Sequence, residues 1–377
     1  MTTKIWRTTR ANAIFLLFLT FSTGAVSFLT SSVHSSATNE LFVCSSNNRL
    51  AIGQDPVRMV GANSYGILAG YLGIGTVTGN TASEKRLPDA ATCGLQIIRF
   101  WLDVAPSDYW FRLTYSKFTQ DNDHQAYFTA LDRFIADARA NNIRLIPVLS
   151  SAFDQWTKTG NGDNFWQVGS KTNLAFKQWT NAIVSRYSNN SSIAWWEVAN
   201  EPNYAAKKGL SRADTPTLVS WGQDIYSYVK NIDPNHLISG GFSNTGNLDI
   251  AEFGQLNKPF DIASMHIYER DLYNLELGRL VFSRENAIRD FIQFYSDYSH
   301  NVLHKPLVFG EFNGDLLTPS PWFVERFLHY ALASADAALI WSWEEGQPTD
   351  HYLVSPDTTP AVVKILQQYA STTLKTS

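Results

Sequence analysis

Short apolar runs alternate along this chain with segments of helical periodicity, and this alternation limits the possible folds more than any other feature. The runs are rich in branched and aromatic residues, which is typical of strands buried on both faces. Eight strands are predicted, over residues 57–62, 95–100, 143–149, 193–199, 236–240, 261–265, 306–310 and 338–343.

Helical segments lie between these runs, because apolar side chains recur there every three or four residues. In the clearest example, Leu131, Phe134, Ile135 and Ala138 share one face. The predicted helices are residues 125–141, 174–187, 217–231, 284–302, 322–335 and 361–369.

Strands joined by helical crossovers run parallel, and eight of them close most naturally into a barrel. The predicted fold class is therefore α/β, a (β/α)8 TIM barrel preceded by a short N-terminal β-hairpin formed by residues 41–43 and 49–52. The alternative is an open doubly wound sheet, which usually has a phosphate-binding glycine turn after its first strand. Gly70, Gly73, Gly75 and Gly79 follow the first strand here, but their spacing does not match G-x-G-x-x-G and indicates a flexible loop instead.

The first 37 residues have the pattern of an export signal. Lys4, Arg7 and Arg10 precede an apolar stretch at residues 11–29, and small residues suited to cleavage follow at 35–37. Residues 1–37 are therefore predicted to be a signal peptide, with a membrane anchor as the alternative, and residues 38–377 a single domain. Either arrangement places that domain outside the cytoplasm, as a secreted, extracellular protein or as one anchored at the membrane.

The chain has two cysteines, Cys44 in the hairpin and Cys93 just before the second predicted strand. In a barrel both cysteines fall toward the face opposite the C-terminal ends of the strands, so a Cys44–Cys93 disulfide is a candidate in an exported protein. Two buried thiols are the alternative.

Charge and composition exclude several classes of partner. The net charge is −4, and no basic stripe is present that would attract nucleic acid or an anionic membrane surface. The 12 Trp and 16 Tyr residues supply flat apolar faces with hydrogen-bonding tips, which suit a neutral, hydroxyl-rich ligand. Neither C-x-x-C nor H-E-x-x-H occurs, so the sequence predicts no metal site, and no cofactor is expected.

Two of the predicted strands end in a glutamate. The segment Trp-Trp-Glu-Val-Ala-Asn-Glu-Pro-Asn at residues 195–203 places Glu201 after a buried run, and residues 306–312 place Glu311 in the same way. A carboxyl group among aromatic residues is partly desolvated, so it holds its proton more tightly and can act as a general acid. Hydrolysis of a glycosidic bond requires two carboxylates, and a barrel brings the ends of all its strands to one rim. The same rim is predicted to hold Arg99, Trp101, Asn200, His266, Tyr268, Trp341 and Trp343.

These motifs resemble those of clan A retaining glycoside hydrolases, and among them family 5. The resemblance is carried by Asn200-Glu201-Pro202, Met265-His266-Ile267-Tyr268, Gly310-Glu311-Phe312 and the strand that contains Arg99. It covers residues from about 57 to 369. It implies that residues 38–377 are a glycoside hydrolase catalytic domain, with Glu201 as the acid/base and Glu311 as the nucleophile.

The resemblance also implies roles for the neighbouring side chains. Retaining enzymes need two carboxyl groups ~5 Å apart, and repulsion at that distance keeps one of them protonated. Arg99, which family members place under the nucleophile, should hold Glu311 ionised and leave Glu201 protonated. Tyr268 should donate a hydrogen bond to Glu311, and Asn200 should bind the 2-hydroxyl of the sugar. His266 and Trp341 should line the subsite where the bond breaks.

Aromatic residues in the predicted loops are candidates for platforms on which sugar rings stack. They are Tyr65, Trp110, Trp156 and Trp166, and Trp101 is a further candidate at its strand end. Packing against the barrel is the alternative for each of them.

The substrate is interpreted from two segments. Residues 196–202 are similar to the corresponding residues of endo-β-mannanases, whereas residues 150–156 lack the histidine that many cellulases of the family carry after the third strand. The prediction is therefore an endo-β-1,4-mannanase-like hydrolase, with an endo-β-1,4-glucanase or a transglycosylase as alternatives. A carbohydrate-binding barrel without turnover is the alternative from another class. The expected partner is a polysaccharide or oligosaccharide, and the mature chain is expected to be a monomer.

Overall fold

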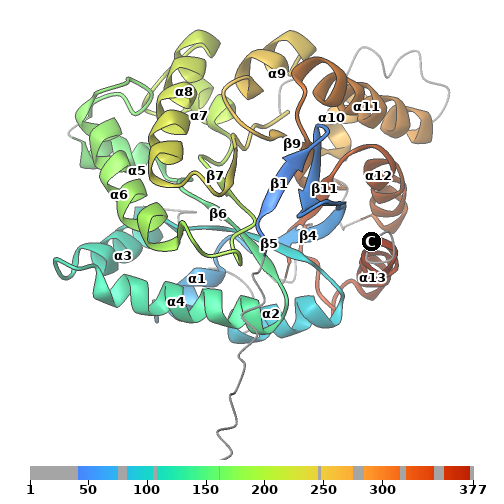
Figure 1. The fold of residues 1–377 in the computed structure, drawn as a ribbon, viewed down its shortest axis with the longest axis horizontal. Helices are drawn as coiled ribbons and strands as arrows, with labels where there is room; N and C mark the ends of the chain where they lie inside the picture. The colour runs from blue at the N-terminus through green and yellow to red at the C-terminus, as the bar shows by residue number, and fades with distance from the viewer. Residues whose placement is uncertain are drawn as a thin grey trace, which may run out of the picture. The chain divides into compact units, whose positions relative to one another are not determined.

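Eight parallel strands form the sheet of the computed structural model. Figure 1 shows strands at the centre of the protein with helices around them. The structure describes residues 41–74, 83–104, 108–160, 162–244, 248–274, 284–314, 320–343 and 352–373. The strands are β4 (Met59–Asn63), β5 (Ile97–Trp101), β6 (Arg144–Val148), β7 (Trp195–Glu197), β8 (Leu237–Ser239), β9 (Ala263–Tyr268), β10 (Leu307–Asn313) and β11 (Ala337–Trp341). All eight predicted strands are present, with ends shifted by a few residues.

The sheet closes on itself. Its order is β8-β7-β6-β5-β4-β11-β10-β9, and every pairing within it is parallel. Two isolated parallel bridges, Ser239 with Ile262 and Ser243 with His266, join the two outer strands of that order. The predicted (β/α)8 barrel is therefore confirmed, and the open doubly wound sheet is excluded.

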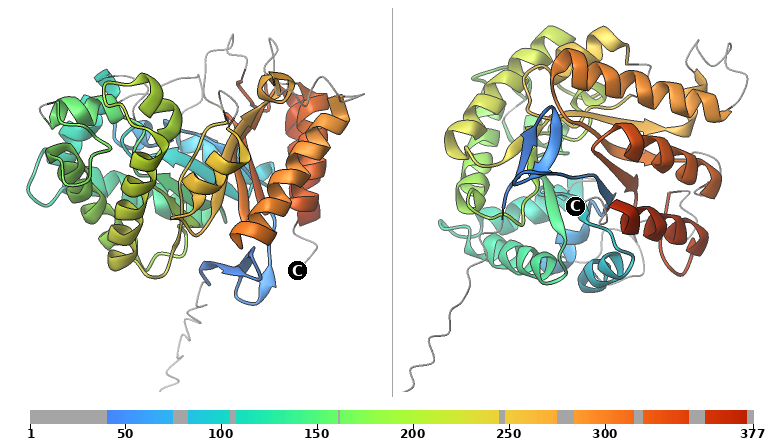
Figure 2. Two further views of the ribbon diagram at one scale, coloured as in Figure 1. Left: turned by 90° about the horizontal axis from the view of Figure 1, so that it is seen from above. Right: turned by 45° about the vertical axis from the view of Figure 1, so that its right-hand side comes forward.

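Helices surround the barrel (Figures 1 and 2). They are α1 (Ile67–Tyr71), α2 (Ser83–Thr92), α3 (Asp108–Thr119), α4 (Gln125–Ala140), α5 (Phe153–Thr159), α6 (Lys171–Tyr187), α7 (Pro202–Lys208), α8 (Thr215–Ile232), α9 (Ile250–Asn257), α10 (Glu269–Asn274), α11 (Arg284–Tyr298), α12 (Pro321–Ser334) and α13 (Pro360–Thr373). The six predicted helices correspond to α4, α6, α8, α11, α12 and α13. A π-helical turn, Ser299–Leu303, follows α11 within the span that was predicted as one helix.

Consecutive residues of each strand face opposite sides, as the two-residue period of a strand requires. Ile98 and Trp196 belong to the apolar layer between barrel and helices, whereas Ile97 and Trp195 fill the barrel interior. The interior is apolar only near the strand N-termini. Its upper half is lined by polar side chains, and these form the site described below.

A hairpin closes the lower end of the barrel. Strands β1 (Val43–Ser46) and β2 (Arg49–Ile52) pair antiparallel, and Asn47 and Asn48 turn between them with φ of 51° and 63°. Both angles lie in the left-handed region that Asn tolerates better than most residues. Val43 and Leu50 join the interior apolar cluster, and Figure 2 shows the hairpin at that end. A third short strand, β3 (Asp55–Pro56), pairs with β2 and was not predicted.

The candidate Cys44–Cys93 disulfide is absent, and the structure has both residues as thiols, which was the alternative. Sγ of Cys44 lies 3.5 Å from the carbonyl oxygen of Ala51 and 3.7 Å from that of Gly53, within its own hairpin. Cys93 follows α2 and is buried in the layer between barrel and helices. The two side chains therefore belong to different packing layers.

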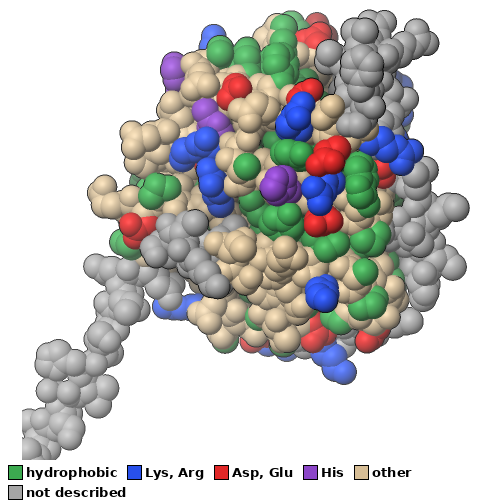
Figure 3. Space-filling model, turned by 90° about the vertical axis from the view of Figure 1, so that its right-hand side faces the viewer, with side chains coloured by type: hydrophobic (Ala, Val, Ile, Leu, Met, Phe, Trp, Pro, Cys, Tyr) green, Lys and Arg blue, Asp and Glu red, His purple; other side chains and the backbone are tan. Residues whose placement is uncertain are grey.

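Residues 40–377 form one compact unit, and the predicted signal peptide at 1–37 lies outside the described residues. Within the described ranges, no helix has both the length and the apolar character that crossing a bilayer requires. On the face drawn in Figure 3, side chains of Lys and Arg are interspersed with those of Asp and Glu instead of gathering by sign.

Candidate active site

The polar half of the barrel interior is built by strand residues that point inward just above the apolar layer. Neighbouring strands bring Asn63 level with Arg99 and His266 level with Glu311. In β10 the register shifts around Gly310, and Phe309 and Phe312 both pack outward on α12. Such a bulge re-aims the intervening side chain, so Glu311 points into the barrel.

Arg99 lies at the centre of this polar layer and is only 1% exposed. Its Nε and Nη2 donate to Oε1 of Glu197 at 2.8 and 2.6 Å, and Nη2 also donates to Oδ1 of Asn200 at 2.7 Å. Nη1 donates to Oδ1 of Asn63 at 2.8 Å and to Oε1 of Glu311 at 2.9 Å. A guanidinium has five N–H groups, and these five bonds use all of them.

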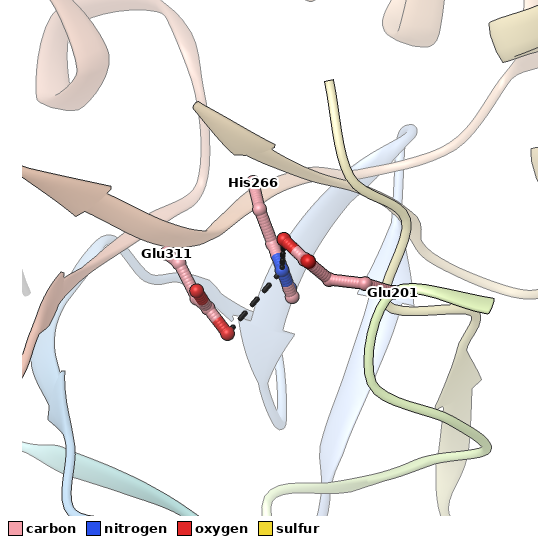
Figure 4. Close-up of side chains that lie close together, drawn as sticks. All are labelled: Glu201, His266 and Glu311. Atoms are coloured by element: carbon pink, nitrogen blue, oxygen red, sulfur yellow. Dashed lines mark hydrogen bonds and ion pairs between the residues drawn. The ribbon is translucent and has the colours of Figure 1, made fainter. Parts of the chain in front are cut away.

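Glu201 and Glu311 face one another across His266, as Figure 4 shows. Nδ1 of His266 lies 3.2 Å from Oε1 of Glu201 and 3.3 Å from Oε1 of Glu311. One oxygen of each carboxylate and the imidazole nitrogen all lie within 4.8 Å of one another. The hydroxyl of Tyr268 donates to the other oxygen of Glu311 at 2.6 Å.

The turn that carries Glu201 has an unusual backbone. Glu201 adopts a left-handed conformation with φ of 52°, and Pro202 then begins α7. Its N–H donates to the carbonyl oxygen of Gly241 at 2.7 Å, and the N–H of Asn200 donates to that of Ser150 at 2.8 Å. Non-glycine residues rarely adopt this conformation, and it persists where neighbouring bonds enforce it.

Burial and hydrogen bonding act in opposite directions on the two glutamates. Burial raises the pKa of Glu311, despite the opposing effects of His266, Arg99 and Tyr268. The pKa of Glu201 is lowered even though burial, the largest influence, acts to raise it. The hydrogen bond and charge of His266 outweigh that burial, and a hydrogen bond from Ser243 assists.

This order is the reverse of the one predicted from the sequence, where Arg99 was expected to keep Glu311 ionised and Glu201 protonated. That expectation took Glu311 as the carboxylate that receives the charge of Arg99. In the structure Arg99 makes two of its five hydrogen bonds to a second carboxylate, Glu197. Its attraction for Glu311 is therefore partly offset, and the burial of Glu311 decides the direction of the shift.

A pocket opens above the two glutamates. Its walls are formed by Trp101, Asn200, Glu201, Tyr204, Tyr268, Arg270, Glu311, Trp341 and Tyr352. Three of these, Tyr204, Arg270 and Tyr352, were not predicted. Tyr204 and Arg270 follow closely after Glu201 and Tyr268 in the sequence, so an extension of the two motifs would have included them.

Comparison with known proteins agrees with this geometry. A family model described as Cellulase (glycosyl hydrolase family 5) matches residues 69–347, well over half of the chain. The chain belongs to glycosyl hydrolase family 5. It is 29% identical to mannan endo-1,4-beta-mannosidase A of Podospora anserina over 209 residues, which are 52% of each chain. It is 25% identical to mannan endo-1,4-beta-mannosidase 8 of Oryza sativa subsp. japonica over 349 residues, 80% of this chain and 87% of the relative.

The chain thus spans about half the length of the first of these curated relatives and most of the second. Among solved structures, the endo-1,4-beta-mannanase from Rhizomucor miehei is 18% identical with a TM-score of 0.65. The match covers 88% of this chain and 99% of that one. At this identity the likeness shows the fold, a (β/α)8 barrel shared with other members of family 5.

Three of the predicted aromatic residues lie together at the site of this family 5 barrel. The ring of Tyr65 stacks on Trp341 with centroids 5.1 Å apart and lies 4.7 Å from Trp101. Trp101 and Trp341 line the pocket, and Tyr65 supports both. Arg99, Asn200, His266 and Tyr268 are also brought together as predicted.

The predicted platform at Trp156 is wrong. Trp156 is fully buried and packs edge-on against Phe111 and Trp179. Its loop forms the short helix α5, which turns the indole toward the core. Trp166 is buried as well, with Nε1 donating to the carbonyl of Ser211. Trp343, expected at the rim, is buried and donates to the carbonyl of Arg86, and the side chain of Trp110 lies outside the described residues.

Glu201, His266 and Glu311 also have the donor types of a metal site. Both oxygens of Glu311 are already hydrogen-bonded, one to Arg99 and the other to Tyr268. A cation at this position would lie close to the guanidinium of Arg99 and be repelled by it. The arrangement therefore fits a pair of hydrogen-bonded carboxylates better than a metal centre.

Proposed function

We propose that this family 5 enzyme hydrolyses internal β-1,4-mannosidic bonds with retention of configuration. The observation that carries the proposal is the separation of the two carboxylates, whose facing oxygens lie within 4.8 Å across a pocket. Retaining enzymes hold their two carboxyl groups ~5 Å apart, whereas inverting enzymes need a wider gap for a water molecule.

Glu311 has the surroundings of a nucleophile. Its side chain is 4% exposed, and hydrogen bonds from Arg99 and Tyr268 fix both of its oxygens. A carboxylate that must attack one face of a sugar ring benefits from this fixed orientation. Glu311 would form the glycosyl-enzyme bond as the leaving oxygen departs.

Glu201 has the surroundings of the acid/base. Its side chain is 21% exposed and lines the pocket, so it can exchange protons with water. A sugar bound in the pocket would exclude that water, which disfavours the charged form and raises the pKa of Glu201. Glu201 would then donate a proton to the leaving oxygen, and after the leaving group departs it would take a proton from the incoming water.

Asn200, Trp101 and Trp341 would bind the sugar ring. Oδ1 of Asn200 accepts from Arg99, which leaves its amide N–H groups to donate to a sugar hydroxyl. The indoles of Trp101 and Trp341 offer apolar faces to the ring carbons. Mannan is proposed as the substrate because the curated relatives quoted above are named as mannan endo-1,4-beta-mannosidases. Export is proposed as well, since the pattern of residues 1–37 is that of a signal peptide.

The test compares wild-type enzyme, Glu201→Gln, Glu311→Gln and the surface control Glu325→Gln on mannan, cellulose and mixed-linkage glucan. We expect mannan to be the preferred substrate and the control to match the wild type. Glu201→Gln should lower kcat/KM on mannan by about 10²–10⁴-fold, the usual contribution of a general acid. Glu311→Gln should show no turnover above background.

An aryl β-mannoside with a good leaving group separates the two roles. Such a substrate needs little acid assistance, so Glu201→Gln should still release the aryl group in a burst, and added azide should speed the second step. Glu311→Gln should give no burst. Full mannan hydrolysis by either variant would contradict the roles, and longer oligosaccharides at high substrate concentration would indicate transglycosylation.

A further inference from the structure

The roles proposed above do not use a buried carboxylate that lies beside Arg99. Glu197 lies at the end of β7, four residues before Glu201, and is 1% exposed. Its Oε1 accepts from both Nε and Nη2 of Arg99, and its Oε2 accepts from the hydroxyl of Ser239 at 2.9 Å. The ion pair between Glu197 and Arg99 is therefore fully enclosed, with hydrogen bonds to both oxygens.

The backbone approaches this carboxylate closely at Gly241. A Cβ atom on Gly241 would lie 2.6 Å from Oε1 of Glu197, and one on Gly310 would lie 3.9 Å from Oε2. Gly241 follows β8, and Gly310 precedes Glu311. The backbone at Gly241 thus confines Glu197 on one side, whereas the position at Gly310 corresponds to an ordinary van der Waals distance.

The position of Glu197 affects the reacting groups through Arg99, which bonds to both. The N–H groups that Glu197 does not use bind Asn63, Asn200 and Glu311. Since a guanidinium is planar and rigid, a rotation that released Glu197 would displace the bonds to Asn200 and Glu311 together. The negative charge of Glu197 also offsets part of the attraction between Arg99 and Glu311.

We propose that Glu197 is a positioning residue, which acts through Arg99 to fix Glu311 and Asn200 and to limit how tightly the guanidinium binds the charge of Glu311. This inference rests on the proposed function of Glu311 as the nucleophile. A carboxylate bound too tightly by a cation is a weaker nucleophile, so the second carboxylate on Arg99 keeps Glu311 reactive.

The test is Glu197→Gln, which keeps the shape of the side chain and removes its charge. The groups that face Glu311 would then be Arg99, His266, Tyr268 and Glu201, with the charge of Arg99 no longer shared. We expect kcat on mannan to fall on the order of 10²-fold, as for a small misplacement of reacting groups. The acid limb of the kcat profile reports ionisation of Glu311 in the enzyme–substrate complex, because the bound sugar raises the pKa of Glu201, and this limb should move to lower pH by about one unit.

Ser239→Ala covers the case in which Glu197→Gln does not fold. It removes one hydrogen bond from Glu197 and keeps the ion pair, so kcat should fall about five-fold with KM little changed. The matched control is Asp233→Asn, another buried carboxylate at the opposite end of the barrel, which should lose stability without moving the acid limb.

Wild-type kcat together with an unmoved acid limb in folded Glu197→Gln would overturn the proposal. Wild-type kinetics in Ser239→Ala would overturn it if the first variant does not fold. Either result leaves the proposed function intact, because that function depends on the activity of the wild type and of the Glu201 and Glu311 variants.

Discussion

At the scale of single residues, Glu311 is governed by a balance between burial and three donors. Burial raises its pKa, while Arg99, His266 and Tyr268 each act to lower it. Tyr268 is the simplest donor to remove, because its phenol makes one hydrogen bond to the carboxylate, at 2.6 Å. Burial also keeps the pKa of Tyr268 itself well above its ordinary value, so the phenol remains a donor over the working range.

Tyr268→Phe should therefore move the acid limb of the kcat profile to higher pH, because a bound sugar raises the pKa of Glu201 and this limb then reports the ionisation of Glu311. The lost bond stabilised the charged form of Glu311, so its pKa rises further, and activity is lost at a higher pH as the solution is acidified. A hydrogen bond to a charged group and the free energy of one pKa unit are of similar size, so we expect a shift of about one unit. The profile is measured on soluble manno-oligosaccharides, and a limb that stayed in place or moved to lower pH would contradict the argument.

The sequence predicted where a residue lies in the fold when a motif fixed its backbone position. Glu201, Glu311, His266 and Tyr268 were located because each ends a buried run, and strand ends in a barrel converge. Glu197 was missed because the sequence around a glutamate in the middle of an apolar run does not indicate which residue it pairs with. Trp156 was placed wrongly because the burial of a loop aromatic depends on tertiary contacts, here those made by α5.

At the scale of elements, the loops after β7 and β8 lock the turn that presents Glu201. Gly241 has φ of 73°, and its carbonyl accepts from the N–H of Glu201 at 2.7 Å. A Cβ atom there would lie 2.0 Å from the carbonyl oxygen of Ala199. The glycine is thus required both by its backbone conformation and by the closeness of the neighbouring strand.

Gly241→Ala should lower both stability and activity. Strain at a positive φ and a clash with backbone atoms together should cost about 3 kcal/mol of the free energy of unfolding. The specific activity of the folded variant should be lower than that of the wild type, because the displaced atoms belong to the segment that carries Glu197 and Glu201. Urea denaturation and mannan hydrolysis are the measurements.

Gly73→Ala is the matched control. Gly73 also has a positive φ of 67°, but an added Cβ would meet nothing within 4 Å. It should lose only about 1 kcal/mol through backbone strain and keep its specific activity. Equal effects of the two substitutions would show that the close approach at Gly241 is unimportant.

The barrel strands and the helices with clear periodicity were predictable from the sequence, whereas the remaining helices and the short strand β3 were not. Long apolar or periodic segments gave all eight strands and six helices. Within the described residues, seven helices were not predicted. Five of them have eight residues or fewer, which gives too little periodicity to recognise: α1, α5, α7, α9 and α10. The longer helices α2 and α3 were also missed. Strand β3 has two residues and depends on pairing with β2, which the local sequence does not encode.

At the scale of the whole molecule, the proposed catalytic groups and the networks that stabilise the fold lie at opposite ends of the barrel. The proposed catalytic groups lie at the C-terminal ends of the strands, and buried polar networks tie the opposite end together. In one of them, Asp336 accepts from the N–H groups of Leu50 and Leu307 and pairs with Nε2 of His300 at 2.9 Å. The hairpin is thereby fastened to the start of β11.

A second network joins α8 to β7 and β8 through Asp233. Its Oδ2 accepts from Nε1 of Trp196 at 2.7 Å and is paired with Nδ1 of His236 at 2.6 Å. Its Oδ1 accepts from the backbone N–H groups of Asn235 and His236. Burial acts to raise the pKa of Asp233, but these bonds, led by that with His236, bring it below its ordinary value.

Asp233→Asn should therefore destabilise the protein by about 2 kcal/mol near neutral pH, the size of a hydrogen bond to a charged group. The folded-state pKa lies below the unfolded value of about 3.9, so this stabilisation is complete above that value and is lost as the pH falls through the folded-state pKa. Urea unfolding at a series of pH values should show the gap between wild type and variant closing below about pH 4. The exposed substitution Asp123→Asn is the control and should show no gap. Because Asp233 lies far along the strands from the pocket, the pH profile of activity should not change, and a shifted profile would refute the separation of the two ends.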